Sequence, residues 1–227
     1  MILSAHQPQY LPWLGYFHKM YHSDIFVFLD NVQYKKREYQ NRNCIRTASG
    51  SIWLTVPVLK EAEPYPNISA VRIDNSQEWR KKHWMTIRTN YGHAPFFKQY
   101  SGFFEELYGT EWKMLADLNM HIIKHIARLL GINKPIFLES QLKITTEKTS
   151  RLVDICRSMK ADAYLSGIGG RDYLDEKQFE SNGIKLIYQD FKHPRYKQCH
   201  EPFISCVSII DLLFNCGERS LKILIGG

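Results

Sequence analysis

Two stretches of this sequence carry groups that could do chemistry. The first lies at the start, where His6 and Gln7 end a short apolar run and Tyr10 and Trp13 follow between prolines. An imidazole can act as a general acid or base near neutral pH, and carboxamides and aromatic tips can hold a polar ligand. Asp30 ends the next apolar run and could orient His6 or act as an independent carboxylate. His6 and Asp30 are therefore the candidate catalytic residues.

The second stretch is a glycine-rich turn that begins at Ser166 and reads Ser-Gly-Ile-Gly-Gly-Arg. Three glycines after a strand and before a helix let backbone N–H groups approach an anion, which the helix dipole then favours. The spacing matches neither GxGxxG nor GxxxxGK[ST], so it identifies no cofactor class. The alternative is an ordinary tight turn.

A polar, basic and aromatic stretch covers residues 31–46, where a loop should leave the same edge of the sheet. Arginine forks onto phosphate, and amides both donate and accept hydrogen bonds, so this composition suits phosphates and sugar hydroxyls. A solvated hairpin is the alternative. The candidate substrate-binding residues from the three stretches, with Lys60 at the end of a later strand, are Gln7, Tyr10, Trp13, Tyr16, Gln33, Asn41, Arg42, Lys60, Ser166, Gly167, Gly169, Gly170, Arg171 and Tyr173.

Other chemistries have weaker signals in this sequence. No serine or cysteine stands in the local context of a nucleophile, so no catalytic triad can be assembled. His121 and His125 have the i, i+4 spacing of metal ligands, but no carboxylate accompanies them in a known pattern. Cys199 and His200 with Cys206 lack a fourth ligand. We expect no metal site.

Composition indicates a globular protein with an anionic partner. The chain has 227 residues, is 44% hydrophobic, and contains no apolar run of about 18 residues, so we expect a soluble cytoplasmic protein. Five cysteines without CxxC spacing predict free thiols. The formal charge of +7 favours nucleotides, sugar nucleotides, tRNA or an acidic membrane face. A homo-oligomer is possible, and the sequence does not specify one.

The order of the predicted elements indicates an α/β fold with a mostly parallel open sheet. We expect strands at 2–6, 24–30, 52–58, 68–73, 136–138, 161–165 and 184–191, and helices after Pro12, over 79–91, after Pro95, over 112–130, from Thr146 or Thr149, over 175–181 and over 206–214. Residues 1–74 would form a first α/β half, 75–131 a helical insertion, and 132–227 a second half. Because ligands of parallel sheets bind beyond the carboxyl ends of the strands, the two chemical stretches could face one another there.

The chain resembles the WbqC-like family of bacterial proteins. The likeness rests on HQPQYLPWLGYF from His6, DIFVFLDNVQY from Asp24, the Asn41-Arg42-Asn43 triplet, WLTVPV from Trp53, and the glycine turn with Tyr173-Leu174. The resemblance implies a setting in surface-polysaccharide and O-antigen synthesis. It also implies transfer of an aminoacyl group such as glycyl to an amino sugar, from aminoacyl-tRNA or a nucleotide-linked donor.

A weaker similarity links the chain to nucleotidyltransferases, of Rossmann-like (HUP) topology, whose first βα turn carries H-x-G-H. Trp13-Leu14-Gly15-Tyr16 lies at that place with Gly15 retained and both histidines absent. Three hypotheses follow. The first is a transferase acting on an amino-sugar precursor, with His6 as acid or base. The second is a nucleotidyltransferase or ATP-dependent ligase using the same cleft. The third is a binding module for a sugar nucleotide or tRNA, without catalysis.

Overall fold

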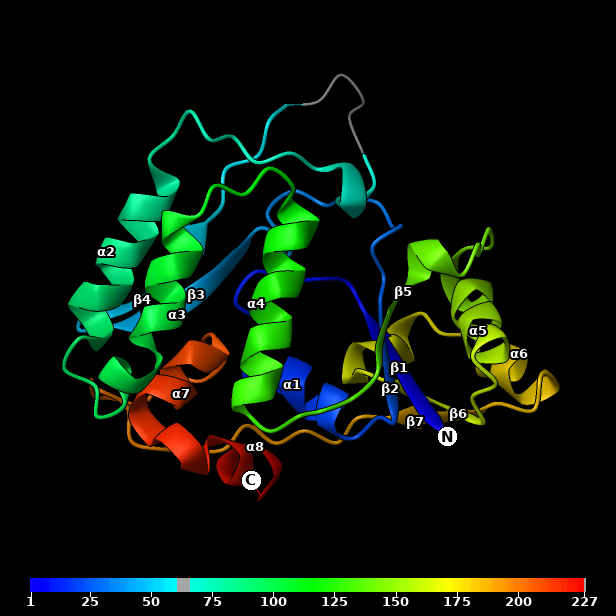
Figure 1. The fold of residues 1–227 in the computed structure, drawn as a ribbon. Helices are drawn as coiled ribbons and strands as arrows, with labels where there is room; N and C mark the ends of the chain where they lie inside the picture. The colour runs from blue at the N-terminus through cyan, green and yellow to red at the C-terminus, as the bar shows by residue number, and fades with distance from the viewer. Residues whose placement is uncertain (61–65, 227) are drawn as a thin grey trace. The chain divides into compact units, whose positions relative to one another are not determined.

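The computed structural model describes residues 1–60 and 66–226 and divides the chain into two units (Figure 1). Unit 1 comprises Met1–Pro8, Gly15–Val32 and Ile132–Phe191. Unit 2 comprises Gln9–Leu14, Gln33–Gly131 and Lys192–Gly227. This division differs from the expected boundaries after residues 74 and 131, because segments far apart in sequence pack together within each unit.

Unit 1 is built on a five-stranded sheet with the order β5-β2-β1-β6-β7, in which all four neighbouring pairs are parallel. The strands are β1 Ile2–His6, β2 Ile25–Phe28, β5 Ile136–Leu138, β6 Ala163–Ser166 and β7 Lys185–Tyr188. The α/β class with a parallel open sheet is therefore confirmed.

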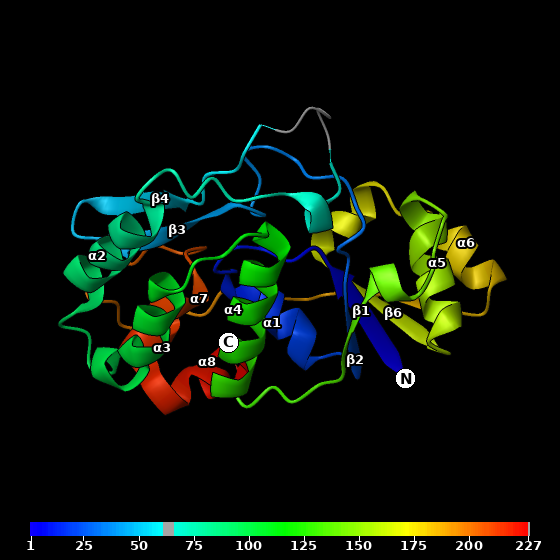
Figure 2. The same cartoon turned by 45° about the horizontal axis from the view of Figure 1, so that its top comes forward.

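Side chains alternate across this sheet and bury both of its faces. Leu3, Ala5 and Val27 pack into a core with Phe179 and the apolar side of α5. On the other face, Phe26 stacks against Tyr16 of α1, with ring centroids 5.5 Å apart. Figures 1 and 2 show α1 on one side of the sheet and α5 and α6 on the other, as a doubly wound fold requires.

The helices of unit 1 follow the predicted order. They are α1 Leu14–Tyr21, the 3₁₀ turn η2 Glu139–Gln141, α5 Lys148–Ser158, η3 Ile168–Asp172 and α6 Glu176–Ser181. The segment after the glycine turn is thus one short 3₁₀ stretch rather than the α-helix that the sequence suggested. A helix dipole consequently contributes little at that place, since too few peptide units are aligned.

Unit 2 contains an antiparallel hairpin of β3 Arg42–Thr47 and β4 Gly50–Thr55. The strand β3 lies inside the stretch that we expected to be a loop. Its alternation is hidden because Asn43 and Thr47 are buried on the same face as Ile45. Polar residues that are buried through hydrogen bonds do not show the apolar alternation on which strand prediction depends.

Helices make up most of the rest of unit 2: α2 Trp79–Tyr91, α3 Phe97–Gly109, α4 Leu115–Leu129, α7 Ile209–Cys216, η4 Gly217–Arg219 and α8 Ser220–Gly226. The helical expectation for 75–131 is confirmed. The predicted strand at 68–73 is wrong, since Ile68–Ala70 forms the 3₁₀ turn η1 and only isolated bridges follow at Arg72 and Ile73. The sequence also did not indicate α8.

Two general expectations can be compared with the described residues. All five cysteines are free thiols, as predicted. No helix in the described part of the chain has the length and apolar character needed to cross a bilayer.

Gly217 ends α7 in a backbone conformation that favours glycine, with φ at 56°, and an added Cβ would overlap the Phe96 ring. We expect Gly217→Ala to lower the free energy of unfolding by about 2–4 kcal/mol, because it combines left-handed strain with overpacking. Urea denaturation measures this. Gly102→Ala is the matched control, since its Cβ would meet nothing within 4 Å inside α3 and should stabilise by about 0.5–1 kcal/mol. Equal effects at the two glycines would contradict this account.

Candidate functional site

A pocket in unit 1 lies where the order of the strands reverses. The chain runs outward from β1 to β2 and β5, then returns to β6 on the other side of β1. Crevices at such a point, beyond the carboxyl ends of the strands, are the usual ligand sites of parallel sheets. This pocket has a volume of about 330 Å³ and is lined by Ala5, His6, Gln7, Lys19, Leu29, Leu152, Tyr164, Ser166, Gly167, Gly169, Gly170 and Tyr173.

His6 is the last residue of β1 and half-buried in this pocket. Its Nδ1 lies 3.2 Å from the Gln7 carbonyl oxygen, and since a carbonyl only accepts, Nδ1 carries the proton. Nε2 therefore keeps its lone pair. The Tyr16 ring packs 4.7 Å from the imidazole, and the Tyr16 hydroxyl donates to the same carbonyl.

Burial lowers the pKa of His6 well below 6.5, and the positive charge of Lys19 lowers it further. The imidazole is consequently neutral at physiological pH. In the tautomer set by Gln7, its Nε2 can accept a proton from a substrate.

Lys19, on α1, is a site residue that our sequence analysis missed. Its side chain is only 4% exposed, and Nζ donates to the Ala5 carbonyl oxygen at 3.0 Å. Burial lowers the pKa of this ammonium to about 7. A signal was available, because Lys19 follows Tyr16 by three positions and so shares its helical face.

No aspartate or glutamate is among the described residues that line this pocket. The Lys19 ammonium is therefore held out of water with a single carbonyl partner and no carboxylate. A buried charge without a partner is costly, and a bound anion would supply the missing countercharge. This is the strongest electrostatic feature of the pocket.

The glycine turn forms the opposite wall. Ser166 ends β6 with its Oγ donating to the Gly167 carbonyl oxygen at 3.0 Å, and Gly170 packs so closely on it that a Cβ would overlap Ser166 Oγ. Gly169 differs, since a Cβ there would meet nothing within 4 Å. The structure thus brings His6 and the glycine turn into one pocket, as the sequence suggested.

The remaining candidates after the turn separate. Tyr173 lines the pocket with a side chain that is 70% exposed. The Arg171 guanidinium instead lies over the Tyr188 ring, 4.4 Å from its centroid, and Arg171 is not among the lining residues. Of the two, only Tyr173 is placed to contact a ligand in this pocket.

The structure does not bring Asp30 to His6. The buried Asp30 carboxylate accepts hydrogen bonds from the Ser140 backbone N–H at 3.0 Å and from Ser140 Oγ at 2.6 Å. These bonds hold the start of the η2 region against the end of β2. The imidazole is oriented by Gln7 rather than by Asp30, and a role for Asp30 as an independent carboxylate stays a prediction.

Six other candidates belong to unit 2. Tyr10 is fully buried, and its hydroxyl hydrogen-bonds to His83 Nδ1 at 2.8 Å and to the Tyr108 hydroxyl at 2.5 Å. Trp13 forms an isolated bridge with Ser208, close to the start of α7. Within unit 2, Tyr10 is therefore a packing residue of the helical layer.

The polar candidates of unit 2 have separate surroundings. Asn41 is buried and its Nδ2 donates to the Val56 carbonyl oxygen at 2.9 Å, while the Arg42 guanidinium lies 4.3 Å from the Trp53 ring centroid. Gln33 is exposed and bridges to Asn67, and Lys60 is exposed at the end of the described loop. Their expected roles in substrate binding stay predictions.

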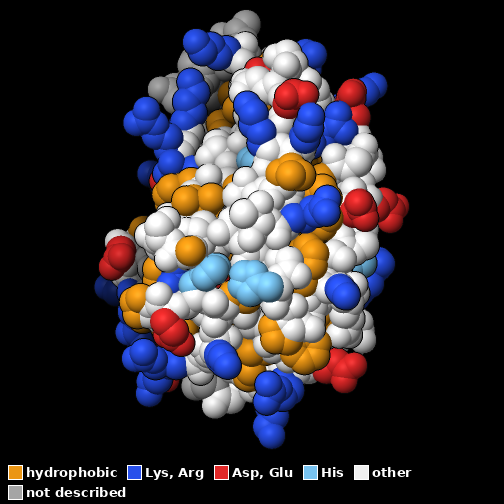
Figure 3. Space-filling model, turned by 90° about the vertical axis from the view of Figure 1, so that its left-hand side faces the viewer, with side chains coloured by type: hydrophobic (Ala, Val, Ile, Leu, Met, Phe, Trp, Pro, Cys, Tyr) orange, Lys and Arg blue, Asp and Glu red, His pale blue; other side chains and the backbone are white. Residues whose placement is uncertain are grey.

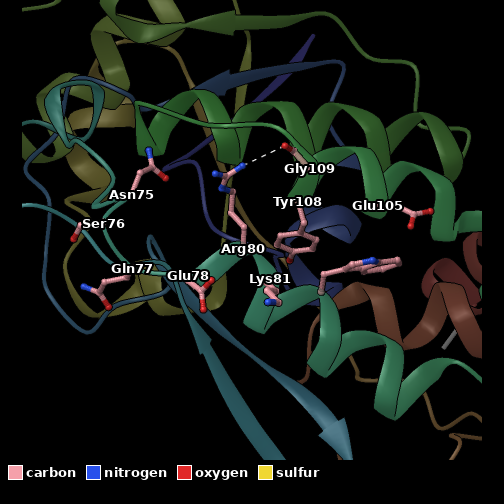
Figure 4. Close-up of a pocket in the computed structure, with 10 residues that line it drawn as sticks. Asn75, Ser76, Gln77, Glu78, Arg80, Lys81, Glu105, Tyr108 and Gly109 are labelled. Carbon is pink, nitrogen blue, oxygen red and sulfur yellow. Dashed lines mark hydrogen bonds between the residues drawn. The ribbon is translucent and has the colours of Figure 1, made fainter.

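A second cavity, of about 500 Å³, lies between the start of α2 and the end of α3 (Figure 4). Its polar groups are largely paired within the protein: Arg80 donates to the Gly109 carbonyl oxygen at 3.2 Å, and Asn75 to the Trp112 carbonyl oxygen at 2.8 Å. Acidic and basic side chains both line it. Although larger, this cavity lacks the buried unpaired charge and the neutral base of the unit 1 pocket.

A family model described as the WbqC-like protein family matches residues 7–223. The chain belongs to this family. It is also similar to the uncharacterized protein Rv1507c of Mycobacterium tuberculosis, with 35% identity over 216 residues that cover 94% of this chain and 93% of that protein. No solved structure matches significantly. The resemblance drawn from the His6 to Phe17 stretch of this WbqC-like protein is therefore confirmed.

The depressed pKa of Lys19 predicts a specific pH dependence of stability. Above about pH 7 native Lys19 has released its proton, whereas the unfolded chain keeps it to about 10.5. The unfolded state then binds more protons, so this residue makes stability rise with pH in that window. Relative to Lys19→Met, the free energy of unfolding of the wild type should gain roughly 1 kcal/mol per pH unit between about pH 7.5 and 9.

Urea titrations at several pH values measure this difference. Lys82→Met, at an exposed position of α2, is the control and should run parallel to the wild type. Parallel curves for Lys19→Met as well would show that Lys19 is not a buried cation.

Proposed function

We propose that this protein is a group transferase that binds a phosphate-bearing substrate in the unit 1 pocket. In the more specific form of the proposal, it moves an aminoacyl group such as glycyl to the amino group of a sugar in surface-polysaccharide synthesis. The observation that carries the anionic substrate is the buried Lys19 ammonium without a carboxylate partner. Family membership supports the proposal, since the resemblance suggested this setting.

The pocket could contribute to such a transfer through its base. The substrate amine attacks the acyl carbon, a C–N bond forms, and the C–O bond to the carrier breaks. His6 Nε2 takes the amine proton and returns it to the leaving oxygen, so that protons balance over the cycle. The backbone amides of the glycine turn are candidates to stabilise the oxyanion.

Substrate binding would also improve the base. The charge of Lys19 is one cause of the low pKa of His6. An anion bound to Lys19 offsets that charge, so the pKa of His6 rises toward neutrality when the substrate is present. A general base is most effective when its pKa lies near the working pH. The unliganded pocket therefore holds a weak base that binding strengthens.

A nucleotidyltransferase or ATP-dependent ligase is the second candidate function. The observation in its favour is the position of the pocket at the reversal of strand order, where nucleotides bind in doubly wound sheets. The absence of both histidines of the H-x-G-H motif around Gly15 speaks against adenylyl transfer. A non-catalytic binding module would use the same pocket without turnover.

Anion binding tests the first step. We expect inorganic sulfate, whose charge is constant over this range, to raise the melting temperature of the wild type and to bind more weakly as pH rises from 6.5 to 8.5. The reason is that Lys19 loses its charge as pH passes about 7. Lys19→Met should abolish the stabilisation, and Gly169→Val should weaken it without unfolding the protein, because its Cβ has free space.

Lys82→Met is again the control and should respond to sulfate as the wild type does. An undiminished response of Lys19→Met would refute the anion site. A much larger shift with a nucleoside triphosphate and magnesium than with sulfate would favour the nucleotidyltransferase.

Turnover tests the chemistry. With a glycyl donor (glycyl-tRNA or glycyl-adenylate) and a UDP-linked amino sugar, mass spectrometry should detect the glycylated sugar. His6→Ala should reduce kcat by about 10²–10⁴-fold, the usual contribution of a general base. Asp30→Asn should keep most of the activity if its carboxylate acts only on Ser140, and a loss comparable to that of His6→Ala would restore Asp30 as a catalytic residue. Full turnover by His6→Ala would exclude His6 as the base.

A further inference from the structure

The outer face of the β3–β4 hairpin exposes aromatic side chains that packing within unit 2 does not use. Trp53 is 46% exposed and Tyr39, just before β3, is 43% exposed. Their ring centroids lie 5.8 Å apart with an interplanar angle of 44°. Most other large aromatic side chains of unit 2 are buried or half-buried. Two adjacent exposed rings are therefore a local exception that a binding role would explain.

Positive charge surrounds these rings. The Arg42 guanidinium lies 4.3 Å from the centroid of Trp53, and Lys35, Lys36 and Arg37 are exposed in the loop that precedes Tyr39. Glu38 is the one acidic residue in residues 33–42. None of these four cations forms a salt bridge with another described residue.

The loop and the hairpin are held in place by hydrogen bonds. The Lys35 backbone N–H donates to Gln40 Oε1 at 2.9 Å, and an Arg42 guanidinium nitrogen donates to the Arg37 carbonyl oxygen. The Tyr39 carbonyl oxygen accepts from the Tyr10 backbone N–H at 3.1 Å. The rings and cations are thus positioned before any partner arrives, which lowers the entropic cost of binding.

Figure 3 shows the side of the molecule that carries α2, with Lys and Arg side chains gathered toward its upper end. Basic character is thus a property of unit 2 beyond the hairpin alone. An apolar protein partner would gain from the rings but not from uncompensated cations at their edge. A partner that combines flat π-faces with regularly spaced negative charges matches both features.

We propose that the outer face of the hairpin, formed by Tyr39, Arg42 and Trp53 with the loop cations Lys35, Lys36 and Arg37, binds a single-stranded segment of nucleic acid. Bases stack on Trp53 and Tyr39, and neighbouring phosphates contact the loop cations. Arg42 is already stacked on Trp53 and extends this platform. The inference is independent of the transfer reaction proposed above, because it concerns other residues and requires no turnover.

Fluorescence anisotropy with a labelled single-stranded RNA of twelve nucleotides tests the proposal at 50 and 200 mM salt. Three to four phosphate contacts give a slope of log K against log salt of about −2 to −3, so affinity should fall about 20- to 60-fold between the two conditions. Trp53→Ala should weaken binding about 5- to 100-fold at either salt concentration while the slope stays unchanged. Trp53→Phe keeps an aromatic ring and should recover most of the affinity.

The charge contribution is tested separately. Replacing Lys35, Lys36 and Arg37 together by alanine should flatten the salt slope by about 2–3. Met85→Ala and Lys82→Ala, which remove an exposed apolar side chain and an exposed cation from α2, are matched controls with wild-type binding. Lys19→Met should also bind RNA normally, which separates a failure here from a failure of the pocket.

Three outcomes would overturn the proposal. The first is equal affinity of the wild type and Trp53→Ala. The second is tighter binding of a fully paired duplex than of the single strand, because paired bases cannot stack on the rings. The third is loss of a dimer, rather than of RNA binding, in Trp53→Ala on light scattering, which would assign the face to a second copy of the chain.

Discussion

The reversal of strand order between β1 and β6 is the constraint on which the unit 1 site depends. Both strands end at the same edge of the sheet, and the chain leaves β1 and β6 toward opposite sides. A parallel sheet must place its connections on its faces, so no backbone fills the space between these two ends. His6 and the glycine turn meet there although about 160 residues separate them in sequence. The pocket is therefore a consequence of connectivity rather than of local motifs.

Electrostatics gives this pocket its chemical character. A buried ammonium, a neutral imidazole and close-packed glycines within one cavity lack the carboxylate that would neutralise them. Burial and mutual repulsion push the pKa values of Lys19 and His6 in the same direction, downward, so both groups are poised to take up a proton or meet an anion. An ordinary structural lysine at this depth would have an acidic partner, as buried Glu139 of the same unit has Arg151 at 3.0 Å. The contrast separates an ion pair that supports the fold from a charge available to a ligand.

Unit 2 shows how side chains of similar type serve different purposes. Tyr10, His83 and Tyr108 form a buried hydrogen-bonded cluster, and Asp211 on α7 accepts from Tyr196 and Gln198 of the extended segment before it. These polar groups satisfy one another and fix the packing of helices and loops. Tyr39 and Trp53, of the same chemical class, are instead exposed beside unpaired cations. Composition alone does not separate these cases, because only the surroundings decide whether a polar aromatic residue is paired or free.

Much of this protein follows from sequence alone. The apolar runs and their spacing predict the parallel strands, the helices over 79–91 and 112–130, and the family, and the end of β1 identifies His6, because periodicity and local motifs are properties of neighbouring residues. Other features are decided only by tertiary structure. The strand β3 has buried polar residues that carry no apolar alternation, the Asp30 carboxylate belongs to Ser140 across the β2 edge, and Lys19 enters the pocket from a helix that looks merely amphipathic. Each depends on which distant groups desolvate or hydrogen-bond a side chain, and that information exists only once the chain has folded.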